Sequence, residues 1–446
     1  MTTPAERARR GKAARGRVPR SAHASWLPPV DRADPVAVLE RQGRDRLPEL
    51  LPVRHGRMAA SPHAFLCGSA AVMAADLASQ PHTGLNVQLC GDAHLLNFEV
   101  YSSPEGALLF DLDDFDETFP GPFEWDVKRL AASVAVAARE NGHRESTVHR
   151  AALESAAAYR DAMRRLARLG ELAVWHERVD AERLLPLVGS ARQRARADAS
   201  LTRARRRTGL RPLGRLTEVV EGRRRIVHDP PALEPAGASD SAALRKIFSD
   251  YRSTLTDERR LLLDRYRFVD AARKVVGVAG VGTRCFVVLL AGRDAEDLLL
   301  LQLKEARQSV LEEHLPTGPF VHPGRRVVAG QRLLQAGADV FLGWMTGPQG
   351  RAFHWRRLRD TKCRADTAGT APAELLAYAR LCGAALARAH ARSGDRLAIA
   401  GYLGGADTFE RAVAEFALAY AAQTTADHTA LCRAVAAGVV SAAPGV

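Results

Sequence analysis

The spacing of apolar and polar residues predicts a chain in which short strands and helices are grouped rather than regularly alternating. Apolar runs bounded by turn residues predict strands at 85–90, 107–112, 275–278, 283–290, 298–304, 340–344 and 352–357. A helical spacing of apolar residues predicts helices at about 125–140, 151–169, 181–187, 327–336, 374–393 and 408–423. The strands near the middle of the chain are separated by glycine-containing turns, which is typical of an antiparallel sheet.

The order of these elements predicts an α+β fold and excludes a Rossmann-type parallel sheet, because strands and helices do not alternate one by one. Composition and pattern divide the chain into five segments. These are a basic disordered arm (1–30), a helical lobe (31–190), an Arg-rich insert or linker (191–245), a β-rich lobe (246–365) and C-terminal helices that complete the helical lobe (366–446).

The composition is that of a globular protein, with 46% hydrophobic and 26% charged residues in 446. No run approaches the ~20 apolar residues of a membrane-spanning helix, so no membrane partner is expected. The basic N-terminus lacks the apolar core of a secretory signal, and the six cysteines are too scattered for a disulfide framework or a zinc site. We therefore expect a cytoplasmic protein with reduced thiols.

The net charge of +13 is concentrated in two segments. Residues 1–21 carry +6 and residues 192–225 carry +9, so the remainder is slightly acidic. A protein that binds nucleic acid through its folded body would spread basic residues over one face, and a nucleic-acid partner is therefore not favoured. An acidic acceptor recruited by the second segment is the functional interpretation, and a solvated linker is the alternative.

Two neighbouring strands end in residues that carry chemistry. The first runs into Cys90-Gly-Asp92-Ala-His94-Leu-Leu-Asn97, and the second contains Phe110-Asp111-Leu-Asp113-Asp114-Phe-Asp116. Four carboxylates within six residues repel one another unless a cation neutralises them, and hard oxygen ligands suit Mg²⁺. We therefore expect a magnesium site here.

The first motif resembles the HGDxHxxN catalytic loop of the protein-kinase-like superfamily, in particular of aminoglycoside and choline kinases. Four of its five fixed positions match. The resemblance implies that Asp92 is the catalytic residue, that Asn97 and Asp111 hold Mg²⁺ with help from Asp113, and that His94 supports the loop.

The helix at 125–140 resembles the one that follows the metal-binding strand in those kinases. Asp126 would then brace the catalytic loop from below.

The β-rich stretch resembles the ATP-gripping lobe of the same superfamily. Gly277, Gly280 and Gly282 form a glycine-rich hairpin, and Lys304 lies on the strand that follows it. The glycines would cover the phosphates of ATP, and Lys304 would pair with the phosphate oxygens. Glu312 and Glu313 are candidate partners for Lys304.

The motif order differs from that of a standard kinase, because the catalytic loop precedes the ATP-gripping lobe. The segment Cys382–Asp395, which ends the helix predicted at 374–393, also resembles the helix that leads into the catalytic loop in these kinases. The resemblance therefore implies a circularly permuted, two-lobed kinase-like fold. The phrases VQLCGDAHLLNF, FDLDDFDETFPGPFEWDVKRLAAS and RAHARSGD further resemble the uncharacterised bacterial family called domain of unknown function 2252.

These features predict an ATP- and Mg²⁺-dependent phosphotransferase that acts on a hydroxyl of a small molecule or a protein. Nucleotidyl transfer is a variant of this hypothesis. One alternative is a phosphatase of the haloacid-dehalogenase type, with Asp111 as nucleophile and Asp113 as acid/base. Another is a non-enzymatic basic binding protein.

Overall fold

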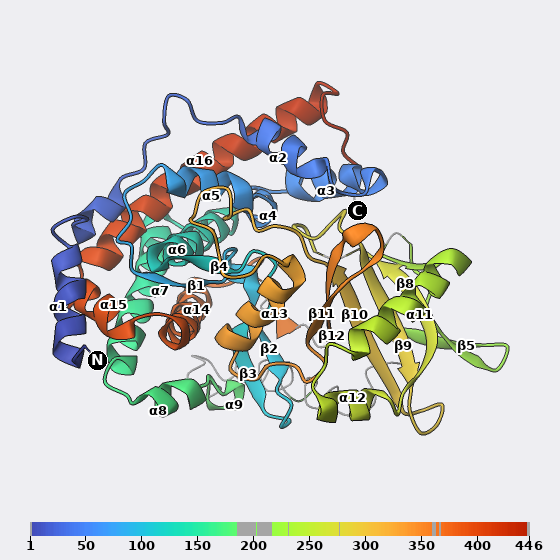
Figure 1. Ribbon diagram of the computed structural model, residues 1–446. Coiled ribbons are helices and arrows are strands. Elements are labelled where there is room, and N and C mark those ends of the chain that lie inside the picture. The colour runs from blue at the N-terminus through green and yellow to red at the C-terminus, as the bar shows by residue number, and fades with distance from the viewer. Residues whose placement is uncertain are drawn as a thin grey trace.

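The computed structural model of the chain describes residues 2–184, 202, 216–230, 232–275, 277–358, 363–364 and 367–443. It is a mixed α+β protein, as predicted, with a helical part on one side and a six-stranded sheet on the other (Figure 1). The helices are α1 (Pro4–Ala14), α2 (Pro35–Gly43), α3 (Leu51–Ala59), α4 (Pro62–Gly68), α5 (Ala70–Ala78), α6 (Phe123–Glu140), α7 (Glu145–Leu166), α8 (Glu171–His176), α9 (Ala181–Leu184), α11 (Ala238–Arg252), α12 (Asp257–Leu263), α13 (Pro323–Leu334), α14 (Pro372–Ser393), α15 (Arg396–Leu403) and α16 (Thr408–Ala436). The strands are β1 (Asn86–Leu89), β2 (Phe98–Ser102), β3 (Leu108–Leu112), β4 (Phe119–Pro122), β5 (Thr217–Val220), β6 (Arg223–Ile226), β7 (Leu233–Pro235), β8 (Arg267–Lys274), β9 (Cys285–Ala291), β10 (Leu298–Glu305), β11 (Gly343–Thr346), β12 (Ala352–Arg357) and β13 (Cys363–Arg364).

The helical part is built around α6, α7, α14 and α16, whose apolar faces share one core with β1 and β3. Helix α6 is buried from Phe123 to Ala138, because the small side chains of its AASVAVAA stretch let neighbouring helices approach from all sides. Helix α14 packs along α7, and the Cβ that Gly383 lacks would collide with the backbone of Ser155. Among the described residues, no helix is both long and apolar enough to cross a bilayer.

The sheet is antiparallel throughout, with the strand order β11-β12-β10-β9-β8-β7. One face is apolar, and Leu301, Leu303 and Trp355 pack there against the aromatic side chains of α11. The other face turns toward the helical part (Figure 1) and carries Lys304 in register with His354 of β12. Because successive side chains of a strand alternate between faces, the face of β10 that carries Lys304 also carries Leu298 and Leu300, which belong to a second apolar cluster.

The N-terminal arm is ordered, contrary to the prediction of disorder for residues 1–30. Thr3 and Glu6 form a capping box at the start of α1, and Arg7 and Arg10 pair with Asp395 at the start of α15. Gly11 lies directly against the backbone of Ala398, so that α1 and α15 are in close contact.

The predicted insert at 191–245 lies partly outside the described residues, and so does most of the Arg-rich segment. Its described portion forms the β5–β6 hairpin, strand β7 at the edge of the large sheet, and the start of α11. The strand predicted at 275–278 is also misplaced, because β8 ends at Lys274. Four of the eight residues of β8 are charged, so the strand contains no apolar run by which it could be predicted.

Candidate functional site

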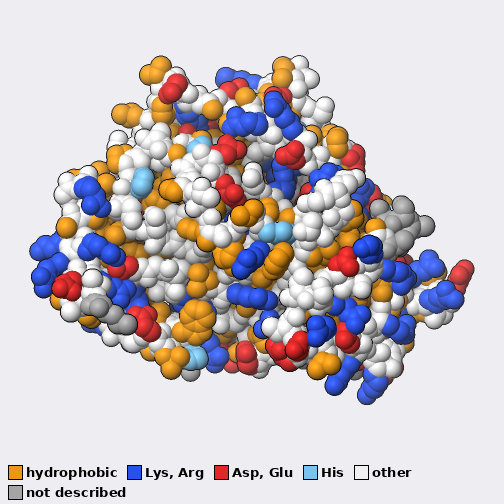
Figure 2. Space-filling model, viewed as in Figure 1, with side chains coloured by type: hydrophobic (Ala, Val, Ile, Leu, Met, Phe, Trp, Pro, Cys, Tyr) orange, Lys and Arg blue, Asp and Glu red, His pale blue; other side chains and the backbone are white. Residues whose placement is uncertain are grey.

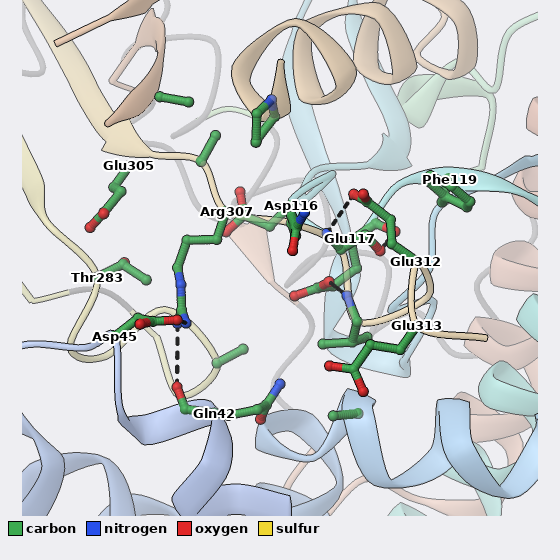
Figure 3. A pocket seen from close by; sticks show the side chains of 18 of the residues that line it. Gln42, Asp45, Asp116, Glu117, Phe119, Thr283, Glu305, Arg307, Glu312 and Glu313 are labelled. Atoms are coloured by element: carbon green, nitrogen blue, oxygen red, sulfur yellow. Dashed lines mark hydrogen bonds and ion pairs between the residues drawn. The ribbon is translucent and has the colours of Figure 1, made fainter. Parts of the chain in front are cut away.

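A cleft of about 1000 Å³ lies where the sheet meets the helical part. The helical part contributes α2, the segment after it, and the loops that hold Asp92 and residues 114–119. The sheet contributes the β8–β9 loop, the end of β10 and the β11–β12 turn. Figure 3 shows charged side chains of both signs in the cleft, with Asp116, Glu117 and Glu312 on one side and Arg307 reaching toward Asp45 and Gln42.

The Gly-Asp loop at the end of β1 is held by a carboxylate beneath it. Asp126, in the first turn of α6, accepts hydrogen bonds from the backbone N–H groups of Cys90 (2.7 Å) and Gly91 (3.0 Å). The ring of His390 lies 3.1 Å from the same carboxylate. Gly91 has φ of +87°, and a Cβ there would collide with the backbone of Glu117. These contacts fix the loop and are those of the supporting role predicted for Asp126.

Asp92 lines the cleft and is oriented by an arginine that the sequence analysis did not select. Arg129, one turn after Asp126 on α6, donates to Oδ1 of Asp92 from Nε (3.0 Å) and Nη2 (2.6 Å). Burial raises the pKa of Asp92 above its ordinary value, and the charge of Arg129 opposes that rise. The second oxygen, Oδ2, lies 3.7 Å from Nε2 of His94.

His94 acts mainly on its own loop. Its Nδ1 accepts a hydrogen bond from the N–H of Leu96 at 3.1 Å and so caps the short turn that ends at Asn97. The same nitrogen lies 3.6 Å from Sγ of Cys67. Because Nδ1 accepts, the neutral ring carries its proton on Nε2, the nitrogen nearer Asp92.

Asn97 links the two acidic loops by hydrogen bonds. Its Nδ2 donates to the carbonyl oxygens of Asp92 (2.9 Å) and Asp114 (3.0 Å), and its Oδ1 accepts from the N–H of Asp114 (2.7 Å). The residue is 3% exposed. Asn97 therefore sets the spacing between the loops, and its predicted role as a metal ligand has no support from this geometry.

The structure does not bring Asp111 into the cleft. Its side chain is fully buried, and its oxygens accept hydrogen bonds from Arg388 of α14 (2.6 Å) and from the N–H of Ala336 (2.8 Å). Asp113 is also buried and lies 3.6 Å from Arg356 of β12. The strand that precedes the carboxylates ends at Leu112, so Asp111 still belongs to it and points into the core. The prediction that Asp111 and Asp113 are metal ligands is therefore withdrawn.

Asp114 and Asp116 line the cleft, and Lys304 contacts both of them from the sheet. The amine of Lys304 pairs with Asp116 and lies 3.6 Å from Oδ2 of Asp114. Burial acts to raise the pKa of Asp114, but the charges of Lys304 and Arg356 outweigh it and hold that pKa below its ordinary value. Burial, and then the charge of Asp114, raises the pKa of Asp116.

The three predicted glycines lie in the loop between β8 and β9, which we call the glycine loop. This loop contacts the segment around α2 and α3, and the residues that it places in the cleft are not the glycines. Gly277 and Gly282 have positive φ, of +60° and +87°, whereas Gly280 does not. The cleft itself is lined by Ala279 and Thr283. The three predicted glycines therefore shape a loop whose tip faces the cleft, and none of them is in its lining.

The predicted glutamate partners of Lys304 are elsewhere. Glu312 lies 3.3 Å from Nε of Arg326 on α13, and Glu313 lies 3.9 Å from Arg41. Asp114, Asp116, Arg129 and Arg356 are the functional candidates that sequence reasoning missed or left secondary. The Asp-rich motif indicated Asp114 and Asp116. Nothing in the local sequence indicated the two arginines, because each contacts a carboxylate that is distant in sequence.

The described residues contain no group of three or more His, Cys, Asp or Glu side chains arranged to hold a metal ion. Mg²⁺ differs from most protein-bound metals because one or two carboxylates and the phosphates of a substrate commonly hold it. Asp114 and Asp116, which have 42% and 28% of their side chains exposed toward the cleft, fit that limited requirement.

The arrangement also bears on the alternative functions. A phosphatase of the haloacid-dehalogenase type needs an accessible nucleophile, and Asp111 is fully buried and paired with Arg388. On the face shown in Figure 2, basic and acidic side chains are mixed, with no large patch of one sign over the residues drawn in colour. Neither alternative gains support from these observations.

The fold and the site define a mixed α+β protein with an acid-rich cleft between a sheet and a helical part. The model of the family DUF2252, described as an uncharacterized protein conserved in bacteria, matches residues 46–434. The chain therefore belongs to this family, as its motifs suggested. No curated protein and no solved structure matches the chain.

Proposed function

We propose that this protein is an ATP- and Mg²⁺-dependent phosphotransferase that acts on a hydroxyl of a small molecule or a protein. The observation that carries the proposal is that Asp92 and Asp114 line one cleft and that the buried amine of Lys304 lies against Asp114. The lysine comes from a strand of the sheet, and the two carboxylates come from loops that Asn97 ties together. Protein kinases use a strand lysine, a metal-binding aspartate and a catalytic-loop aspartate in this combination.

The sheet supports the nucleotide-gripping role by its order of elements. Strands β8 and β9 flank the glycine loop, and the third strand, β10, carries Lys304. Helix α13 follows before β11 and β12. A glycine-rich hairpin, then a lysine on the third strand, then a helix is the order that the kinase resemblance implies.

The permuted order is supported by the end of α14. The hydroxyl of Ser393 accepts a hydrogen bond from the N–H of Gln88 at 3.1 Å, although these residues are 305 positions apart. Gly394 packs against Val87. In the unpermuted order that we infer, α14 would lead directly into β1 and the Gly-Asp loop, and the two segments lie close enough for that connection.

Asp92 would orient the acceptor hydroxyl and take up its proton through Oδ2, because Arg129 occupies Oδ1. Lys304 would bind phosphate oxygens as a point charge, in place of part of its contact with Asp116. Asp114 and Asp116 would hold Mg²⁺ together with the phosphates. When bound, Mg²⁺ would offset the negative charge on the transferring phosphoryl group.

Two variants test the roles assigned here. Asp92→Asn should lower turnover of ATP by at least about 10²-fold while Mg·ATP still binds, because it removes the proton acceptor and leaves the nucleotide contacts. Lys304→Ala should weaken ATP binding itself. The measurements are ATP affinity by calorimetry and product analysis with labelled ATP, with Glu313→Gln as a control because Glu313 lines the same cleft but is 65% exposed and, among the described residues, pairs only with Arg41, at 3.9 Å. Full activity of Asp92→Asn, or parent-like ATP affinity of Lys304→Ala, would show the roles to be wrong.

A further inference from the structure

One arginine of the cleft is tied to the glycine loop and lacks an acidic partner. Arg46 follows α2 and lines the cleft. Its Nη1 donates to the carbonyl oxygens of Ala279 (2.8 Å) and Val281 (2.6 Å), both in the β8–β9 loop. The Cβ that Gly282 lacks would come within 3.0 Å of the Arg46 side chain. Arg46 therefore lies directly against the loop that faces the cleft.

The positive charge of Arg46 is not neutralised by any ion pair with the described residues. Its Nε is buried and has no hydrogen-bond partner. Burial, and then the charge of Arg307, lowers the pKa of Arg46 to about 10, so the side chain remains charged at neutral pH. Arg46 is partly buried, and the charges of Glu117, Asp116 and Glu305 offset the lowering of its pKa only in part. A partly buried charge with no ion pair is stabilised by an anion that binds beside it.

A second guanidinium lies near the first. Arg307, on the chain after β10, pairs with Asp45 at 3.0 Å, and Asp45 is 77% exposed. An exposed ion pair of this kind contributes little, so Arg307 can exchange Asp45 for another anion at small cost. Figure 3 shows the Arg307 side chain extending into the cleft toward Asp45 and Gln42.

We propose that Arg46 and Arg307 form an oligophosphate-binding site at the tip of the glycine loop, which in the proposed phosphotransferase receives the polyphosphate of the nucleotide. The planar guanidinium presents paired N–H donors that match the oxygens of a phosphate. Arg46 has donors left after its two bonds to the loop, since a guanidinium has five N–H groups. The inference rests on the proposed function for the identity of the ligand, and on Arg46 and Arg307 alone for the presence of an anion site.

The test uses the full chain and two probes, inorganic tripolyphosphate and ATP, each measured by calorimetry. Arg46→Ala should weaken tripolyphosphate binding by about tenfold or more, because a charge-assisted contact is lost. Arg46→Lys should give an intermediate affinity, because it keeps the charge and loses the fork. ATP affinity should fall in parallel with that of tripolyphosphate.

The matched control is Arg57→Ala. Arg57 donates to the carbonyl oxygen of Gly277 at 2.6 Å, so this change also removes one arginine contact with the loop, but Arg57 does not line the cleft. It should leave tripolyphosphate affinity unchanged. If Arg46→Ala alters the melting temperature, Arg307→Ala serves as the second variant, since its side chain is 26% exposed and its removal leaves the loop contacts of Arg46 intact.

The outcomes separate this inference from the proposed function. Loss of tripolyphosphate binding in Arg46→Ala supports the anion site even if the parent does not turn over ATP, and in that case only the proposed function fails. Tripolyphosphate binding that is absent in the parent, or equal in the parent and both arginine variants, overturns the site. Equal losses in Arg46→Ala and Arg57→Ala would attribute the effect to the loop and would also overturn it.

Discussion

The two carboxylate oxygens of Asp92 have different partners. Arg129 donates twice to Oδ1, while Oδ2 lies 3.7 Å from Nε2 of His94. Arg129 is 3% exposed and also donates to the carbonyl oxygen of Leu66 at 2.6 Å, so its position is fixed by the helical core. Arg129 is therefore a positioning residue that would determine both the orientation and the charge of Asp92.

Arg129→Lys should shift the acidic limb of the pH–rate profile toward higher pH. Burial raises the pKa of Asp92 and Arg129 limits that rise, so weakening this contact raises the pKa further. The active form is the carboxylate, and the rate therefore falls as pH drops through the raised pKa. The measurement is kcat against pH, with KM for ATP expected to stay unchanged.

The control for this prediction is Arg139→Lys, on the same helix. Arg139 pairs with the exposed Glu145, and neither residue lines the cleft. Arg139→Lys should give the same pH–rate profile as the parent. Superimposable profiles for Arg129→Lys and the parent would contradict the assignment.

The choice among the four carboxylates of 111–116 could not be made from sequence. The motif predicted an acidic site, and the structure places Asp114 and Asp116 in the cleft. Asp111 is excluded by its partner Arg388, which lies 277 residues further along the chain. Neither the end of β3 nor such a long-range ion pair is encoded in the local pattern.

At the scale of elements, the turn after β1 depends on glycine for two separate reasons. Gly91 has a positive φ, and its missing Cβ allows the close approach of Glu117. Gly106, in the β2–β3 turn, also has a positive φ (+83°) but has open space around it. The two glycines allow backbone strain to be separated from steric contact.

Gly106→Ala should lower the free energy of unfolding by about 1–2 kcal/mol, the cost of a left-handed conformation for a residue with a Cβ. Gly91→Ala should cost clearly more, since the added Cβ must also displace the backbone of Glu117. Urea unfolding of both variants measures the difference. Equal losses would show that the close approach at Gly91 has no energetic weight.

Periodicity predicted the elements whose apolar residues are regular. Strand β12 was predicted at its observed bounds, and α6 and α14 within two residues of theirs. Helix α1 was missed because only Gly11 and Ala14 of its residues are buried. Its attachment comes from arginines, including Arg15, which donates to the carbonyl oxygen of Tyr402 at 2.8 Å. Such contacts leave no hydrophobic stripe to recognise.

For the whole molecule, ion pairs join the sheet to the helical part beside the cleft. Lys304 contacts Asp114 and Asp116, and Arg356 lies 3.6 Å from Asp113. The cations come from β10 and β12 and the carboxylates from the segment after β3. The α+β class was predictable from the order of elements, but this pairing depends on how two distant segments meet.

Lys304→Met should lower the free energy of unfolding by about 1–3 kcal/mol, less than for a fully buried pair because water reaches Asp114. Mg²⁺ should then raise the melting temperature of this variant more than that of the parent, since the ion no longer competes with the lysine amine for Asp114 and Asp116. Thermal unfolding with and without Mg²⁺ measures this.

The control is Lys128→Met. Lys128 is also buried, but its amine donates to Gln80 at 2.6 Å and forms no ion pair with the described carboxylates. This variant should gain nothing from Mg²⁺ beyond the parent. An equal response of Lys304→Met and the parent would argue against a magnesium site at Asp114 and Asp116.

The pairing of Asp111 with Arg388 also affects the order in which segments of the newly synthesised chain can be buried. A ribosome that adds about 5–20 residues per second needs on the order of tens of seconds to pass from Asp111 to Arg388. During that interval the guanidinium of Arg388 is not available to Asp111, and burying the carboxylate without it would be costly. We therefore expect β3, although it is synthesised early, to reach its final buried place only after α14 has been synthesised.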